Sequence, residues 1–408
     1  MKKPSRETIR GHVLEELLAR LLQRNGYRLL VAADQDPEAL KDSELGLLVR
    51  GRGADHQVDV LGELDLPLPF SLPIRLFVEA KYRKAKTGLP MVRNASGTLH
   101  DVNETFGAIP PDTDRLPLRR YHYRYALFSA SGFTTPAQQF ALAHQISLVD
   151  LSNPGFAPLL TAADDLAAET VALIEQSRVS RFPLRQFRTA LRHVLGTWPA
   201  SVSDEDFSEL SHLISNLRPG RSAETVPGVV SMTTDYGVAQ RSTRIAESLN
   251  GLRDQSGDGD ADDSEGFAPL REFPTYQLAS TMAGLATDHL GSLVLGFPPA
   301  AFVLVLVADD SAAFDAYLSA VQGTDVRVHL EFAERHKVSR DWVIVPADGS
   351  DAFRLRFTLP ELLAKWMFEG GVPTWSIRDI KATMFSSIAL FRANRVIRLV
   401  YEPHAQRT

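Results

Sequence analysis

Apolar residues recur every three or four positions between Thr8 and Asn25, and Gly26 follows where a helix-ending glycine is expected. This spacing predicts a helix with one buried face. Short apolar or alternating runs then predict strands, separated by polar and proline-rich turns. The predicted order of elements is helix 8–25, strands 27–33, 57–63, 75–82 and 124–131, helix 135–145 and strand 146–152. We expect residues 1–155 to form one α/β domain.

Different patterns divide the rest of the chain. Residues 156–250 are expected to be mainly helical, with amphipathic stretches between 162 and 217. Residues 251–268 are acidic and glycine-rich, which is typical of a flexible linker. Residues 269–408 return to strand and helix patterns, which predict a second α/β domain. Its predicted strands are 301–308, 325–334, 341–347 and 353–360, and its predicted helices are 311–322 and 359–368.

The composition of the 408 residues excludes several classes of protein. The chain has no cysteine, so it has neither disulfides nor thiolate metal sites. No apolar run is long enough to span a membrane, and the N-terminus does not resemble a signal peptide. We therefore expect a cytoplasmic protein without membrane contact. The net charge of −6 argues against a protein that coats nucleic acid through bulk charge. Any contact with nucleic acid would be local.

One charged pair interrupts an otherwise apolar strand, "RLFVEAKYRKAK". Glu79 and Lys81 are two residues apart, so they point to the same face of that strand. Charges in such a place need a partner or a metal. Asp59 lies twenty residues upstream, on the preceding predicted strand. If the two strands pair as a hairpin, both carboxylates reach one end of it, where they suit Mg²⁺. A metal and a lysine together favour phosphodiester hydrolysis, because they place positive charge where negative charge develops.

Four segments in this order resemble the PD-(D/E)xK nuclease superfamily, and within it the Mrr-like restriction endonucleases. The resemblance covers roughly residues 8–152. It rests on the first helix with its Gly-Tyr end, the strand with Asp59, the Glu-x-Lys strand, and the later strand–helix–strand. These are "RGHVLEELLARLLQRNGY", "GRGADHQVDVLGE", "FVEAKYR" and "YALFSASGFTTPAQQFALAHQISLVDL". The resemblance implies a restriction-endonuclease-like mixed sheet flanked by helices, so residues 1–155 would be the nuclease domain.

The resemblance also implies roles for individual residues. Asp59 and Glu79 would be metal ligands, and the carbonyl of Ala80 would be a third. Lys81 would stabilise charge on the phosphate or orient the attacking water. Glu15, on the first helix, often completes the metal site in this family.

Gln57 is expected beside Asp59 on the same strand face, where it can position water or phosphate. His56-Gln57 stand where Mrr proteins often have Gly-Gly.

Two segments near this site combine basic and aromatic residues, which is typical of contacts with a phosphate backbone. The candidate nucleic-acid-binding residues are Arg83, Lys84, Lys86, Arg119, Arg120 and Arg124. Solvated surface charge is the plainer interpretation of both segments. Plainer interpretations also exist for the site: Glu79 and Lys81 as a cross-strand ion pair, Glu15 as a solvated helix residue, and Gln57 as strand surface.

The expected function is that of an Mg²⁺- or Mn²⁺-dependent endonuclease acting on DNA, with RNA as a further substrate class, in prokaryotic restriction or defence against phage. The C-terminal half carries no phosphate-binding loop or zinc-type histidine cluster. We expect it to regulate the nuclease through a partner protein, a guide-bearing complex or a nucleotide signal. A homodimer would allow both strands to be cut. The alternative is a non-catalytic nucleic-acid-binding or scaffold protein that retains the nuclease fold.

Overall fold

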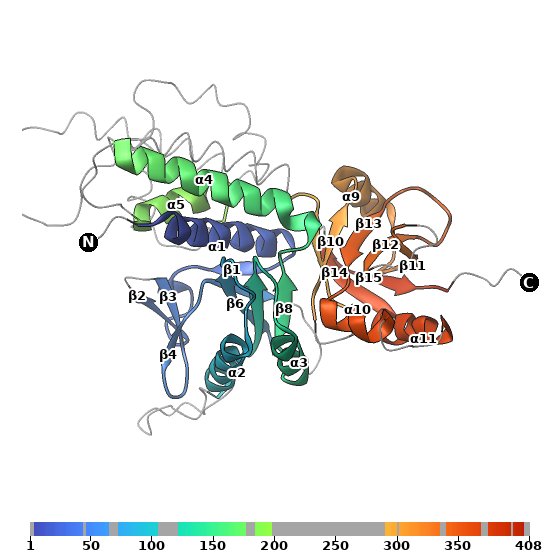
Figure 1. The fold of residues 1–408 in the computed structure, drawn as a ribbon, viewed down its shortest axis with the longest axis horizontal. Coiled ribbons are helices and arrows are strands. Elements are labelled where there is room, and N and C mark those ends of the chain that lie inside the picture. The colour runs from blue at the N-terminus through green and yellow to red at the C-terminus, as the bar shows by residue number, and fades with distance from the viewer. Residues whose placement is uncertain are drawn as a thin grey trace, which may run out of the picture. The chain divides into compact units, whose positions relative to one another are not determined.

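The computed structural model shows a mixed α/β protein with several sheets (Figure 1). It describes residues 4–43, 46–64, 72–104, 121–176, 184–197, 290–299, 302–334, 340–368, 374–392 and 395–403. The end of the predicted helical region, residues 198–250, and the whole acidic segment 251–268 lie outside these residues. The chain divides into two compact units. Unit 1 comprises residues 1–17 and 162–287, and unit 2 comprises residues 18–161 and 288–408.

The described part of unit 1 is helical, as predicted. Helix α1 (Arg6–Arg24) begins in unit 1, and its last turns belong to unit 2. Helix α4 (Ala157–Gln176) and helix α5 (Leu184–Leu195) supply the rest. Two arginines of α1 are joined to α4, because Arg6 and Arg10 contact the carboxylate of Asp164 at 2.6 and 3.0 Å.

The first sheet of unit 2 has five strands in the order β1-β5-β6-β7-β8. Its strands are β1 (Arg28–Leu30), β5 (Val60–Leu64), β6 (Ile74–Lys81), β7 (His122–Ser129) and β8 (Ser147–Asp150). The pairs β1–β5 and β5–β6 are antiparallel, and β6–β7 and β7–β8 are parallel. The hairpin expected from the sequence is therefore formed by β5 and β6, and the strand–helix–strand pattern that follows it is confirmed.

Several neighbouring elements were not predicted. Between the strands predicted at 27–33 and 57–63, the structure has the short helix η1 (Ala33–Gln35) and a three-stranded sheet of β2 (Leu40–Ser43), β3 (Gly46–Arg50) and β4 (Asp55–Gln57). Helix α2 (Leu89–Asn103) precedes β7, and helix α3 (Thr135–Ala143) is the predicted one. Figure 1 shows α2 and α3 on one side of the five-stranded sheet. One hydrophobic core unites α2, α3, the small sheet and one face of the larger sheet.

The second large sheet of unit 2 has seven strands in the order β14-β15-β11-β12-β13-β10-β9. An isolated antiparallel bridge between Phe297 and Ala389 joins its two edges, so the sheet closes on itself. The core of this sheet contains Trp342, which is fully buried. The strands are β9 (Leu293–Gly296), β10 (Leu304–Ala308), β11 (Asp325–Phe332), β12 (Asp341–Pro346), β13 (Leu355–Thr358), β14 (Ser387–Arg392) and β15 (Arg395–Tyr401). The helices are α9 (Ser311–Ala320), α10 (Glu361–Phe368) and α11 (Thr374–Met384). Of these elements, β9, α11, β14 and β15 were not predicted.

The end of α1 contacts the seven-stranded sheet within unit 2. Gly26 ends the helix with a φ of +85°, a conformation that favours glycine. A Cβ atom at Gly26 would also lie 1.8 Å from the ring of Phe391, so two independent constraints require glycine there. The buried side chain of Asn25 bonds to the carbonyl of Leu21 at 2.8 Å and accepts the N–H of Leu295 at 2.7 Å.

The described helices were compared with the length and hydropathy that a membrane span requires. None of them is both long and apolar enough to cross a bilayer.

The buried phenol of Tyr27 makes the stability of the fold depend on pH in the alkaline range. Tyr27 is 5% exposed, and burial raises its pKa. Above pH ~10 the unfolded chain loses the phenol proton while the folded chain keeps it, so stability falls as pH rises. We expect the difference in free energy of unfolding between wild type and Tyr27→Phe to be constant below pH ~9. Above pH ~10 the free energy of unfolding of wild type should fall relative to that of Tyr27→Phe, by up to about 1.4 kcal/mol per pH unit. Denaturant titrations from pH 8 to 11.5 measure this, and a constant difference throughout would contradict it.

Candidate active site

The candidate site lies where β5 begins and β6 ends, at one end of the antiparallel hairpin. Val60 and Val78 form the last residue pair of this ladder. Asp59 precedes Val60 and Glu79 follows Val78, so the two acidic residues face each other one step beyond it. The backbone N–H of Ala80 is donated to Asp59 Oδ2 at 2.8 Å, which ties the aspartate to the neighbouring strand. The hairpin therefore brings together the two carboxylates that the sequence placed twenty residues apart.

Both oxygens of Glu79 have close partners. Lys81 Nζ lies 2.5 Å from Oε1, as expected for side chains on one face of a strand. The hydroxyl of Tyr125 donates a hydrogen bond to Oε2 at 2.5 Å. Burial raises the pKa of Tyr125, and the charges of Glu79 and Asp59 raise it further, so the phenol keeps its proton and acts as the donor. Asp59, Glu79, Lys81 and Tyr125 therefore form one polar group.

The middle of the face that carries these residues is hydrophobic. Leu61 of β5, Phe77 of β6 and Tyr125 of β7 lie side by side in register and belong to the core shared with α2 and α3. The rings of Phe77 and Tyr125 stack with centroids 4.9 Å apart. The side chains of Glu79 and Lys81 are only 16% and 18% exposed. The charges therefore sit at the edge of a packed core, where electrostatic interactions are stronger than in water.

The opposite end of the same face holds a second polar group, which is fully enclosed. Arg75, 1% exposed, contacts Asp36 at 2.7 Å and Glu63 at 2.8 Å. Its guanidinium also lies 3.4 Å from the ring centre of Tyr121 and donates to the hydroxyl of Tyr123 at 3.2 Å. Arg28 also contacts Glu63, so two arginines face the two carboxylates and every charge is paired within the protein. The group is therefore a structural ion cluster and not a site.

The donor set at Asp59 and Glu79 fits a hard divalent cation. Two carboxylates on adjacent strands, with the carbonyl of Ala80 directly after Glu79, offer the oxygen ligands that Mg²⁺ and Mn²⁺ prefer. Within the described residues there is no group of three or more His, Cys, Asp or Glu side chains that could hold a metal. The two carboxylates would therefore need water molecules to complete the coordination, which is usual for Mg²⁺.

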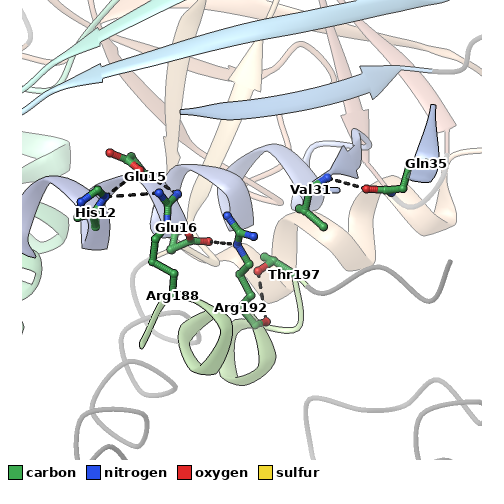
Figure 2. A network of polar contacts seen from close by, with 8 residues as sticks. All are labelled: His12, Glu15, Glu16, Val31, Gln35, Arg188, Arg192 and Thr197. Atoms are coloured by element: carbon green, nitrogen blue, oxygen red, sulfur yellow. Dashed lines mark hydrogen bonds and ion pairs between the residues drawn. The ribbon is translucent and has the colours of Figure 1, made fainter. Parts of the chain in front are cut away.

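Glu15 lies in a different polar group, inside unit 1 (Figure 2). Its carboxylate contacts Arg188 at 2.8 Å and His12 at 3.3 Å. The neighbouring Glu16 is almost fully buried and is held by Arg188 at 2.8 Å and Arg192 at 2.9 Å. Burial opposes ionisation of Glu16, but the two arginines outweigh it and lower its pKa. This group fastens α5 to α1, and the predicted role of Glu15 as a metal ligand stays a prediction.

Gln57 does not share a strand with Asp59, so that part of the sequence prediction is wrong. Gln57 is the last residue of β4 and pairs with Leu48 of the small sheet, whereas β5 begins only at Val60. The chain therefore leaves one sheet and enters another between the two residues. Gln57 is exposed at the edge of the small sheet.

The candidate phosphate-binding residues are partly described. Arg83 and Lys84 are exposed directly after β6. Lys86 forms an ion pair with Glu361 of α10 at 2.9 Å, and Arg124 donates to the side chain of Gln145 at 3.0 Å. Arg119 and Arg120 lie outside the described residues.

Tyr125 is the member of the site that the sequence did not single out. It belongs to the basic and aromatic segment 119–125, where the arginines were the candidates. Its contact with Glu79 depends on the parallel register of β6 and β7, which places Tyr125 opposite Phe77. No local pattern in the sequence fixes that register.

Comparisons with known proteins give no family assignment. No family model matches the chain, and no curated protein matches it. Among solved structures, a protein of unknown function, AF1548, matches with a TM-score of 0.27 and 16% sequence identity. The match covers 50% of this chain and 96% of that chain. A TM-score this low carries no argument, so the candidate site rests on its own geometry.

Substitutions of the two adjacent glutamates of α1, Glu15 and Glu16, should change the stability of the protein by different amounts. Glu16→Gln leaves the partly buried Arg192 without its carboxylate and Arg188 with Glu15 alone, whereas losing one partner of a fully buried pair costs about 3–5 kcal/mol. Since the pKa of Glu16 is lowered in the folded state, its contribution is present above the ordinary glutamate pKa and is lost as pH falls. We expect Glu16→Gln to speed amide hydrogen exchange in α5 at pH 7, and this difference from wild type should shrink towards pH 3.

Glu15→Gln is the matched control, since Arg188 keeps its contact with Glu16 in that variant. It should change exchange in α5 far less. Equal exchange in wild type and Glu16→Gln at pH 7 would contradict the role given to Glu16.

Proposed function

We propose that this protein is a metal-dependent nuclease that hydrolyses DNA phosphodiester bonds, with a restriction-endonuclease-like domain in residues 1–155. The observation that carries the proposal is the facing pair Asp59 and Glu79 at the end of the β5–β6 hairpin, with Lys81 on the same face. This is the geometry that the PD-(D/E)xK resemblance requires of its central motif. A structural ion pair alone would not need a second carboxylate beside it.

Each residue of the group has a defined task in this proposal. Asp59 and Glu79 would hold Mg²⁺ or Mn²⁺, which would supply Lewis-acid polarisation of the phosphate and make water a stronger nucleophile. Lys81 places its positive charge against the phosphate or orients the attacking water. The water oxygen loses a proton to solvent as it forms a bond to phosphorus, the bridging P–O bond breaks, and the leaving oxygen takes up a proton from solvent. Arg83, Lys84 and Arg124 would contact the backbone beyond the cleaved bond.

The proposed task of residues 269–408 is control of this nuclease. Two contacts within unit 2 support it. Glu361 at the start of α10 pairs with Lys86, a candidate phosphate-binding residue, and the side chain of Gln138 in α3 accepts the N–H of Leu362 at 2.9 Å. A partner protein, a guide-bearing complex or a nucleotide signal would act through this part of the chain. The setting we propose is prokaryotic restriction or defence against phage.

Cleavage assays test the assignment of the site. The full-length protein is incubated with Mg²⁺ or Mn²⁺ and supercoiled plasmid, linear duplex, single-stranded DNA or RNA. We expect cleavage of DNA that falls at least about a hundredfold in Asp59→Asn and in Lys81→Met, because each removes a charge that acts on the transition state. Asp325→Asn, in the exposed Asp325–Arg398 ion pair of the seven-stranded sheet, is the control and should cleave like wild type.

Equal cleavage by wild type, Asp59→Asn and Lys81→Met would refute the site. Retained DNA binding with neither cleavage nor Mn²⁺ binding in wild type would favour the non-catalytic nucleic-acid-binding protein instead.

A further inference from the structure

We infer that Tyr125 is a positioning residue that fixes the carboxylate of Glu79 in the orientation needed to bind a divalent cation. This inference rests on the proposed function, because it assigns a task within the proposed metal site. It adds a residue from a third strand, β7, to the two strands that the sequence motif describes.

The ring of Tyr125 has very little freedom to move. It is 2% exposed, stacks on Phe77 with an interplanar angle of 17°, and belongs to the core shared with α2 and α3. Because β6 and β7 are parallel and Phe77 pairs with Tyr125, the ring lies beside β6 two residues before Glu79. The hydroxyl at its far end reaches Glu79 Oε2. A rigid part of the core therefore holds one oxygen of the carboxylate.

The other oxygen of Glu79 has a partner of a different kind. Lys81, the last residue of β6, reaches Oε1 with its long, flexible side chain. In the proposed reaction Lys81 acts on phosphate or water, so its contact with Glu79 would be exchanged when substrate and metal bind. The bond from Tyr125 would remain, since stacking on Phe77 and burial hold the phenol in place. A carboxylate has about four acceptor positions, so accepting one hydrogen bond leaves Glu79 able to bind a cation.

Tyr125 is not a catalytic residue in this account, because its burial keeps it from substrate. Hydrogen-bonded partners of metal-binding side chains orient their ligands, and their loss typically costs about 10–100-fold in metal affinity or activity. The structure also offers a matched comparison on the same strand. Tyr123 is likewise buried at 5% exposure, but its hydroxyl bonds to Arg75 in the structural ion cluster at the other end of the face.

The test compares Tyr125→Phe with Tyr123→Phe in the full-length protein. Phenylalanine keeps the ring and its packing and removes only the hydroxyl. Mn²⁺ binding is measured by electron paramagnetic resonance of the free ion, and melting temperature is measured without metal. We expect Tyr125→Phe to raise the Kd for Mn²⁺ about 10–100-fold, and Tyr123→Phe to leave it within twofold of wild type. Asp59→Asn, which removes one proposed ligand, shows the Mn²⁺ affinity to expect when the site is lost.

A cleavage titration with metal supplies a second measurement. Tyr125→Phe should need about 10–100-fold more Mn²⁺ for half-maximal cleavage, and cleavage at saturating Mn²⁺ should return to near the wild-type rate. An unchanged Mn²⁺ affinity in Tyr125→Phe, or an equal loss in Tyr123→Phe, would overturn the inference while leaving the proposed function intact. If wild type and Asp59→Asn bind Mn²⁺ equally, the proposed metal site itself fails and the inference fails with it.

Discussion

The constraint on which the site depends is the placement of two carboxylates opposite each other at the edge of a packed core. Like charges in such a place repel, and each loses part of its hydration. Asp59 and Glu79 tolerate this because three donors compensate them: the N–H of Ala80, the ammonium of Lys81 and the hydroxyl of Tyr125. Two facing carboxylates are also the oxygen ligands that a hard divalent cation prefers, which is the physical core of the nuclease proposal.

The same face of the sheet shows how the fold keeps that arrangement in place. Arg75 and its acidic partners close one end with every charge paired internally, and the stacked rings of Phe77 and Tyr125 fill the middle. The carboxylates at the other end are thus attached to strands whose register the core fixes. Sites built on rigid strands hold their geometry more closely than sites on loops. The buried phenol of Tyr125 extends this rigidity to the side chain of Glu79.

The sequence predicted the parts of the site that depend on local pattern. Alternation placed Glu79 and Lys81 on one face, and spacing paired their strand with that of Asp59. It failed for Gln57, because the change from one sheet to another within three residues has no local signal, and it missed Tyr125, whose contact depends on a parallel register. Helix α2 was missed because its buried positions include small or polar residues, which weaken the periodic pattern. For β14 and β15, in contrast, alternating apolar residues are present in the sequence and would have allowed the prediction.

The nuclease proposal requires that a divalent cation binds between the strands that carry Asp59 and Glu79. Crystals of the full-length protein soaked in Mn²⁺, with diffraction data collected at the manganese absorption edge, test it most directly. The account predicts an anomalous peak at about 2.0–2.3 Å from a carboxylate oxygen of each residue, the range for a hard divalent cation with oxygen ligands. It also predicts that the peak disappears in Asp59→Asn. A manganese peak bound elsewhere, or a peak at this position that persists in Asp59→Asn, would contradict it.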